Sequence, residues 1–237
     1  MPFSEWEIIS RKVGQVLTEV KKGNNTKRIM MIVISALAVV AAGLAVFILT
    51  RPSMDAPKLS VGDLYEFGEY DGQKISWKVL AVEDDRALII SEHILLEKEY
   101  NKGLKDITWK ECSLRSWLNG EFLDSCFTPE ERSIILLSDL ENPDNDAFCT
   151  EGGDDTKDRI FLLSVDEAEK YFADDDARSA GRPGRENNRW WLRTPGYIGC
   201  SAVIVFSFGQ ISDRGNYVNH DNFGVRPAMW IKAEQAK

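Results

Sequence analysis

The sequence predicts an α+β domain over residues 59–232, preceded by one transmembrane helix over residues 29–49. In residues 59–232, strand patterns come first, helical patterns follow and strands return. This order is typical of helices grouped against an antiparallel sheet. Residues 29–49 are 21 consecutive positions without a charged side chain, and at about 1.5 Å per residue they match a hydrocarbon layer of roughly 30 Å.

The residues around this apolar run predict its orientation. Four cations precede it, at Lys21, Lys22, Lys27 and Arg28, and two follow soon after, at Arg51 and Lys58. The positive-inside rule therefore places residues 1–28 in the cytoplasm and the C-terminal domain outside, in a single-pass protein of the cell membrane. No convincing cleavage site follows the run, so we expect an uncleaved anchor. We expect residues 50–58 to form a stalk and residues 233–237 a tail.

An amphipathic helix is predicted within residues 1–28. Its apolar side chains recur at intervals of three and four residues, at Trp6, Ile9, Val13, Val16 and Val20, and Ser4 with Glu7 fits a capping box. Two interpretations stay open for this stripe. It lies in the lipid interface, or it pairs with a partner helix.

The domain begins with the pattern of an antiparallel meander. Asp71-Gly72 joins two strand-like runs and is a strong hairpin signal. Asp84-Asp85 turns the chain into a third strand over residues 87–91.

Helical signals occupy the middle of the domain. A helix over residues 113–118 is expected to stop at Asn119-Gly120, and residues 122–127 add another turn or two. Capping boxes start two further helices, one at Thr128 and one at Ser164 after a strand-like run over residues 159–163. Strands return over residues 202–208 and 225–231, with a turn expected at residues 213–215.

Charge and cysteine content narrow the classes of function. The chain carries a net charge of −9. Residues 1–28 hold six Lys/Arg and three Glu, which is +3, and residues 29–49 hold no charge, so residues 50–237 carry −12. An acidic domain argues against nucleic acid as a partner. Four cysteines allow three disulfide pairings, namely among Cys112, Cys126, Cys149 and Cys200. With two histidines and no Cys-x-x-Cys, we expect no structural zinc.

Residues 139–158 are dense in carboxylates and amides, which are ligands that calcium prefers. An EF-hand register from Asp144 fails because Phe148 and Cys149 stand where an oxygen ligand and the turn glycine belong. Two interpretations stay open: a calcium site with Asp144 and Asp146 as candidate ligands, or a solvated acidic loop. No other cofactor is expected.

Catalysis has little support in the sequence. The nucleophile elbow Gly-x-Ser-x-Gly is absent, and no spacing singles out a carboxylate pair. His220-Asp221 supplies part of a metal triad at most. We therefore expect no catalytic residues.

A polar segment over residues 212–224 lies between two predicted strands. Tyrosine and amide side chains on a rigid sheet often form binding surfaces, because tyrosine offers a large contact area at low entropic cost. The alternative is a polar connection without a function.

Several segments together resemble an uncharacterised family of bacterial surface domains over about residues 59–232. They are Gly62-Asp63, Phe67-Gly68, WKVL, ALIIS, TWKECSLRSWLNGEF, DRIFLLSVDEAEKYF, RWWLRTPG and GVRPAMWI. That family is similar to the superfamily of C-type lectin folds, which includes formylglycine-generating enzymes and the variable ligand-binding proteins of diversity-generating elements. The resemblance implies a C-type-lectin-like fold for the domain.

The resemblance also implies roles for individual residues. In the variable binding proteins, exposed residues between the WWLR-like strand and the last strand contact the ligand. The matching ligand-binding residues here are Tyr197, Asp213, Arg214, Asn216, Tyr217, Asn219, His220, Asp221 and Asn222. Structural roles fall to Trp190, Trp191, Arg193 and Arg226, and we expect Arg193 to bond to buried carbonyls or a carboxylate. On a strand Trp190 and Trp191 point to opposite faces, so at most one of them lines a site.

These observations predict a membrane-anchored, extracytoplasmic binding module without catalysis. Its ligand is expected to be a surface glycan, peptidoglycan or a protein. Two alternatives stay open: a formylglycine-generating-type or metal-dependent enzyme, and a structural partner of another envelope protein. The four cysteines match no active-site spacing of the first alternative, and two histidines are too few for the three-histidine iron site of related enzymes.

Overall fold

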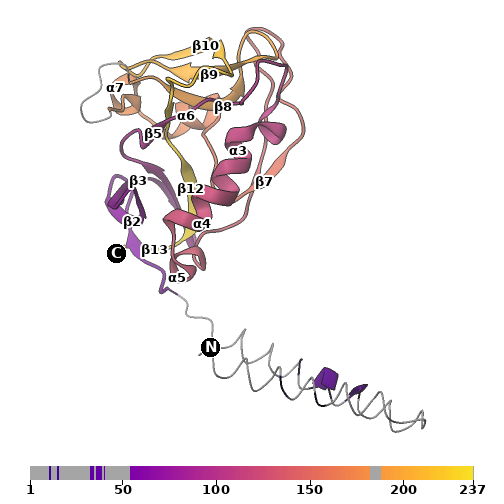
Figure 1. The fold of residues 1–237 in the computed structure, drawn as a ribbon. Coiled ribbons are helices and arrows are strands. Elements are labelled where there is room, and N and C mark those ends of the chain that lie inside the picture. Colours follow the sequence, from indigo (N-terminus) through magenta and orange to yellow (C-terminus); the bar gives the residue numbers. More distant parts are fainter. Residues whose placement is uncertain are drawn as a thin grey trace, which may run out of the picture. The chain divides into compact units, whose positions relative to one another are not determined.

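The computed structural model describes residues 54–181 and 188–236, together with single helical positions between residues 11 and 40. The chain divides into two units, Met1–Pro52 and Ser53–Lys237. The second unit is a mixed α+β domain, mostly β, with largely antiparallel sheets, which confirms the predicted class (Figure 1).

The predicted span over residues 29–49 and the amphipathic helix over residues 1–28 lie outside the described residues, apart from those single positions. Among the residues that are described, no helix has the length and apolar character needed to cross a membrane.

A four-stranded sheet in the order β12-β4-β3-β2 forms one half of the domain. It contains β2 (Leu64–Tyr70), β3 (Gln73–Glu83), β4 (Arg86–Ser91) and β12 (Ala228–Lys232). The predicted meander is confirmed. Asp71 and Gly72 both have positive φ, 51° and 74°, as a two-residue hairpin of type I′ requires. The first turn therefore follows from local sequence.

The two ends of the domain pair with each other. β1 (Lys58–Leu59) runs parallel to β13 (Glu234–Gln235), and Ala233 is buried. The pairing thus brings into the domain residues that we assigned to the stalk and the tail.

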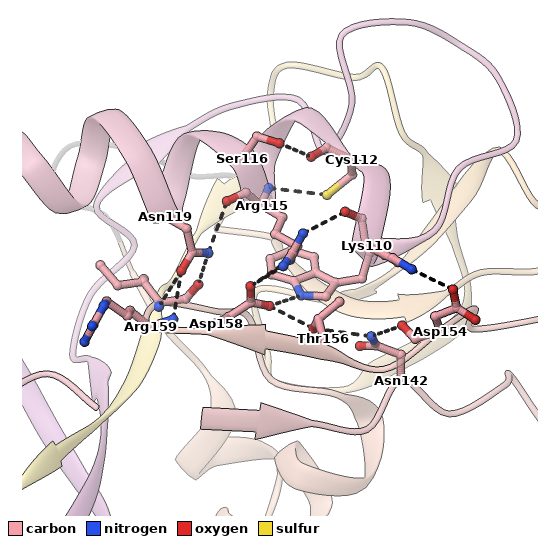
Figure 2. A network of polar contacts seen from close by, with 12 residues as sticks. Lys110, Cys112, Arg115, Ser116, Asn119, Asn142, Asp154, Thr156, Asp158 and Arg159 are labelled. Carbon is pink, nitrogen blue, oxygen red and sulfur yellow. Dashed lines mark hydrogen bonds and ion pairs between the residues drawn. The ribbon is translucent and has the colours of Figure 1, made fainter. Parts of the chain in front are cut away.

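The helical segment after β5 (Leu96–Glu97) does not stop at Asn119-Gly120, so that prediction is wrong. The 3₁₀ turn η1 (Trp109–Glu111), α3 (Ser113–Trp117), the π-helical η2 (Leu118–Phe122) and α4 (Leu123–Cys126) follow one another. Asn119 Nδ2 donates to the carbonyls of Arg115 and Ile160, and its Oδ1 accepts from the amide of Arg159 (Figure 2). The helical segment continues past Asn119 because this side chain makes tertiary hydrogen bonds there.

Both predicted capping boxes are confirmed. Thr128 caps α5 (Pro129–Arg132) with Glu131, and Ser164 caps α6 (Val165–Tyr171) with Glu167. The short α7 (Asp175–Arg178) follows, and β6 (Ser138–Leu140) pairs with β7 (Thr156–Asp158).

Residues 159–163 do not form the predicted strand. Their one ladder contact is an isolated bridge between Phe161 and Ala228. Residues 160–163 are nonetheless buried in the core, so burial without strand pairing accounts for their apolar pattern.

The second half of the domain is a five-stranded sheet in the order β10-β9-β8-β11-β5. It contains β8 (Trp190–Pro195), β9 (Ser201–Val205), β10 (Ile211–Tyr217) and β11 (Gly224–Val225). The turn expected at residues 213–215 is wrong, because β10 runs through it with a bulge between Ser212 and Asn216. The turn lies earlier, where the amide of Phe206 donates to Gln210 O.

Arg226 lies where the chain passes from β11 in one sheet to β12 in the other, so the strand predicted over residues 225–231 is split. Its guanidinium donates to the carbonyls of Ser91, Glu92 and Arg178. Burial lowers the pKa of Arg226 to about 10, which leaves the group charged at neutral pH. Arg226 therefore satisfies the backbone at the junction between the sheets.

Candidate functional site

An open aromatic surface lies at the edge of the five-stranded sheet, and we call it the aromatic patch. It consists of Phe148, Tyr197, Arg214, Tyr217 and His220. The hydroxyls of Tyr197 and Tyr217 are 3.1 Å apart, and the Phe148 ring centroid lies 6.3 Å from that of Tyr197. The guanidinium carbon of Arg214 lies 4.3 Å from the Tyr197 ring centroid. Three segments distant in sequence thus contribute to one surface: the loop at residue 148, the turn at residue 197 and residues 214–220.

The patch exposes its rings to solvent. Phe148 is 42% exposed and Tyr217 is 39% exposed, and the neighbouring Ile198 is 37% exposed. Large apolar side chains gathered in one exposed place are typical of interaction sites. The tyrosine pair adds polar groups, and its hydrogen bond raises the pKa of Tyr197.

The bulge in β10 determines which side chains face the patch. Gly215 has a φ of 64°, and a Cβ at this position would overlap the Ala202 carbonyl. Asp213 and Arg214 are consecutive and both exposed, and they lie within the register shift between Ser212 and Asn216. Glycine at this position is therefore what lets β10 display Arg214 beside Tyr197.

The loop over residues 143–150 is tied to the sheet by one buried amide. Asn145 Nδ2 donates to Pro195 O at 2.7 Å and to Asp213 O at 2.8 Å, and Asn145 is 4% exposed. This anchor holds the loop against the ends of β8 and β10. Phe148 consequently reaches Tyr197.

An acidic cavity of about 270 Å³ adjoins the patch. Its lining has five carboxylates and no lysine or arginine: Pro143, Asp144, Asn145, Asp146, Ala147, Val165, Asp166, Glu169, Thr194 and Asp213. None of these carboxylates forms a salt bridge within the described part of the chain. The cavity therefore carries negative charge that the described residues do not neutralise.

The candidate calcium ligands line this cavity. Asp144 Oδ1 accepts a hydrogen bond from the Gly152 amide at 2.8 Å. Within residues 54–181 and 188–236, no three His, Cys, Asp or Glu side chains are close enough together to hold a metal ion. Asp144 and Asp146 both contribute to the acidity of the cavity.

The structure brings together part of the predicted ligand-binding set. Tyr197, Arg214, Tyr217 and His220 form the patch, and Asp213 lines the cavity. Asn216 accepts a hydrogen bond from the Tyr217 amide. The three remaining residues are exposed in the turn after β10: Asn219, Asp221 and Asn222.

Sequence reasoning missed Phe148. Phe148 is not among the predicted ligand-binding residues. The signal that could have identified it is a single phenylalanine in a run of carboxylates and amides. Its contact with Tyr197 depends on the Asn145 anchor, which no local pattern reports.

The two tryptophans do not line the site. Trp190 and Trp191 are both fully buried. Trp191 Nε1 donates to Lys98 O at 3.0 Å, and its ring lies 4.4 Å from that of Phe223. Trp190 packs against the Arg226 guanidinium, with 5.2 Å from the guanidinium carbon to the ring centroid. Both rings belong to the core.

Arg193 has the kinds of partner that we expected for it. Its five N–H groups donate to Asn142 Oδ1, to the carbonyls of Glu141 and Leu162, and to both carboxylate oxygens of Glu167. Every donor is satisfied although the side chain is buried. Arg193 thus joins β8 to the capping box of α6.

A second buried network surrounds Asp158 (Figure 2). Its carboxylate accepts hydrogen bonds from Trp109 Nε1 at 2.9 Å, Arg115 Nε at 2.7 Å and Thr156 Oγ1 at 2.9 Å.

Cys112 caps the adjacent helix, and burial raises the pKa of its thiol to about 12. All four cysteines are free, so none of the three pairings is formed. A buried, protonated thiol is a poor nucleophile, so this network is structural.

The fold and the site together define a mixed α+β domain that exposes an aromatic surface beside an acidic cavity. The chain belongs to the family described as a domain of unknown function, DUF6273, whose model matches residues 84–233. The matched range contains the aromatic patch and the residues that line the cavity. No curated protein and no solved structure matches the chain.

Proposed function

We propose that this protein is a non-catalytic binding module that takes its ligand on the aromatic patch. The observation that carries the proposal is the group of exposed rings, with a hydrogen-bonded tyrosine pair, at an open sheet edge. Tyrosine and phenylalanine give a large contact area for little loss of side-chain entropy, and a rigid sheet supports them. The ligand classes are a surface glycan, peptidoglycan or a protein.

The proposal includes a single-pass anchor over residues 29–49 that places the domain outside the cell. Its support is the uncharged run itself and its four described large apolar side chains, which are helical and 45–63% exposed: Val33, Ile34, Leu37 and Val40. Placing such side chains in an apolar surrounding is favourable. A C-type-lectin-like fold is also part of the proposal, supported by the mixed α+β architecture.

The orientation can be tested at Cys149, which is an exposed free thiol. A membrane-impermeant maleimide added to intact cells is expected to label this residue, and Cys149→Ser should remove most of the label. Labelling that appears only after lysis contradicts the extracytoplasmic location.

The binding surface can be tested with the full chain, purified in a mild detergent, on arrays of glycans, peptidoglycan fragments and surface proteins. Tyr217→Ala and His220→Ala should each weaken binding without lowering the thermal midpoint by more than about 2 °C. Gln73→Ala, at an exposed position of β3 in the other sheet, is the matched control. Binding that is unchanged in Tyr217→Ala and His220→Ala would refute the site.

A further inference from the structure

We infer that the ligand of the aromatic patch is a basic segment of a partner protein, and that one of its lysine or arginine side chains enters the acidic cavity. This inference rests on the proposed function, because it names the ligand class for the same surface. Four observations support it: the contiguity of the two features, the charge of the cavity, its size and the cation–π contact that a ring of the patch already makes.

The patch and the cavity are contiguous along two segments. On β10, Asp213 lines the cavity and the next residue, Arg214, lies over Tyr197. On the loop, Ala147 lines the cavity and the next residue, Phe148, contacts Tyr197. A single ligand that covers the patch therefore reaches the cavity.

The charge of the cavity favours a cation. Five carboxylates line it, and none has a basic partner in the described part of the chain. Like charges around a partly enclosed space repel one another, and a bound cation relieves this repulsion. Such a space concentrates cations and disfavours anionic partners.

The size of the cavity favours one side chain. A volume of about 270 Å³ lies below the range of roughly 300–1,000 Å³ typical of pockets that enclose a whole small ligand. Lysine and arginine carry their charge at the end of a flexible apolar stem. The stem can contact the exposed rings while the charged group reaches the carboxylates.

Within the protein, a ring of the patch already contacts a cationic side chain. The Arg214 guanidinium lies over the face of Tyr197, in the geometry of a cation–π contact. The rings of Phe148 and Tyr217 remain partly exposed for a ligand. A neutral glycan supplies no positive charge for the cavity, which is why we assign a basic protein segment.

The test uses the full chain in a mild detergent and a fluorescent peptide of repeated glycine, serine and lysine. Glu169→Gln with Asp213→Asn is expected to weaken binding about 10-fold, since close charge pairs at interfaces contribute more than about 1.4 kcal/mol. The control is Glu66→Gln with Glu121→Gln, which removes two exposed carboxylates, one on β2 and one on η2. The control should change affinity less than about 2-fold.

Three outcomes overturn the inference. Equal weakening by both pairs of substitutions would show general attraction to an acidic protein. Binding of the same peptide with acetylated lysines at undiminished affinity would remove the role of charge. Tighter binding of a glucosamine oligomer than of the lysine peptide would assign the site to an amino glycan.

Failure of the proposed function has a different signature. If Phe148→Ala and Tyr217→Ala leave peptide affinity unchanged while the cavity substitutions weaken it, the patch is not part of the site. If the patch substitutions weaken ligand binding on the arrays and the cavity substitutions do not, the patch function stands and the basic ligand is wrong.

Discussion

Arg193 and Arg214 show two uses of the same side chain in neighbouring parts of one sheet. Arg193 is 3% exposed, and all five of its N–H groups donate to protein acceptors. Arg214 is exposed and rests on the Tyr197 ring, with no hydrogen bond from its guanidinium to another described residue. The buried arginine joins parts of the fold, whereas the exposed one keeps its donors available to a ligand.

The aromatic residues of the same sheet divide in the same way. Trp190 and Trp191 are buried and pack among other core rings, while Tyr197 and Tyr217 pair through their hydroxyls at the surface. The difference teaches that residue type alone does not identify the site. Buried rings and arginines with all donors satisfied have structural roles, whereas exposed rings and arginines with free donors are available to bind a ligand.

The largest effect is expected for Arg193→Met. The substitution leaves the Glu167 carboxylate and two carbonyls without their buried donor, so we expect a loss of about 3–5 kcal/mol in the free energy of unfolding. Arg214→Met is the matched control and should change stability by less than about 0.5 kcal/mol. Urea unfolding monitored by tryptophan fluorescence measures both. Equal effects would remove the distinction between the two arginines.

A smaller loss is expected for Asp158→Asn, which breaks the second buried network. Arg115 is partly exposed, so water compensates some of the lost ion pair, and we expect about 2–3 kcal/mol. The same urea experiment measures it, with Asp154→Asn as control, because Asp154 pairs with Lys110 at the surface. A loss below about 1 kcal/mol would show that Asp158 is not a structural centre.

Alkaline pH should destabilise the core through Cys112. Its thiol pKa is about 12 in the folded state and near 9 when unfolded, so the stability it contributes is complete below pH 9 and is lost as the pH rises towards 12. At pH 10.5 the loss is about 2 kcal/mol relative to neutral pH. Tyr100 acts in the same direction.

Cys112→Ser isolates the contribution of this thiol, because serine keeps an acceptor for the Arg115 amide and does not ionise in this range. We expect urea unfolding of the variant to depend less on pH between 8 and 10.5. An unchanged slope would assign the alkaline loss to other groups.

The smallest effect on stability is expected for Tyr217→Phe in the patch. The lost hydrogen bond is exposed, so the free energy of unfolding should change by less than about 0.5 kcal/mol. Because that bond raises the pKa of Tyr197, the substitution should move this pKa downward. Ultraviolet absorbance titration measures the shift, with Tyr70→Phe as the control. A pKa of Tyr197 that does not fall would contradict the pairing.

Local signals predicted much of the fold. The hairpin at Asp71-Gly72 and the capping boxes at Thr128 and Ser164 depend on residues within four positions of each other, and all three are present. The helix stop at Asn119-Gly120 failed because Asn119 bonds to Ile160, 41 positions away. The predicted turn at residues 213–215 is wrong because Gly215 belongs to a β-bulge of β10 that packs against Ala202.

The sequence by itself determined the α+β class, the meander and the helix starts, since short-range hydrogen bonds and apolar periodicity specify them. The tertiary structure alone decided that Phe148 joins Tyr197 and Tyr217, and that Asp213 shares a cavity with Glu169. These residues meet because the Asn145 anchor and the pairing of β8, β9 and β10 bring distant segments together. Such contacts depend on how the elements pack against one another, and local sequence patterns do not predict that packing.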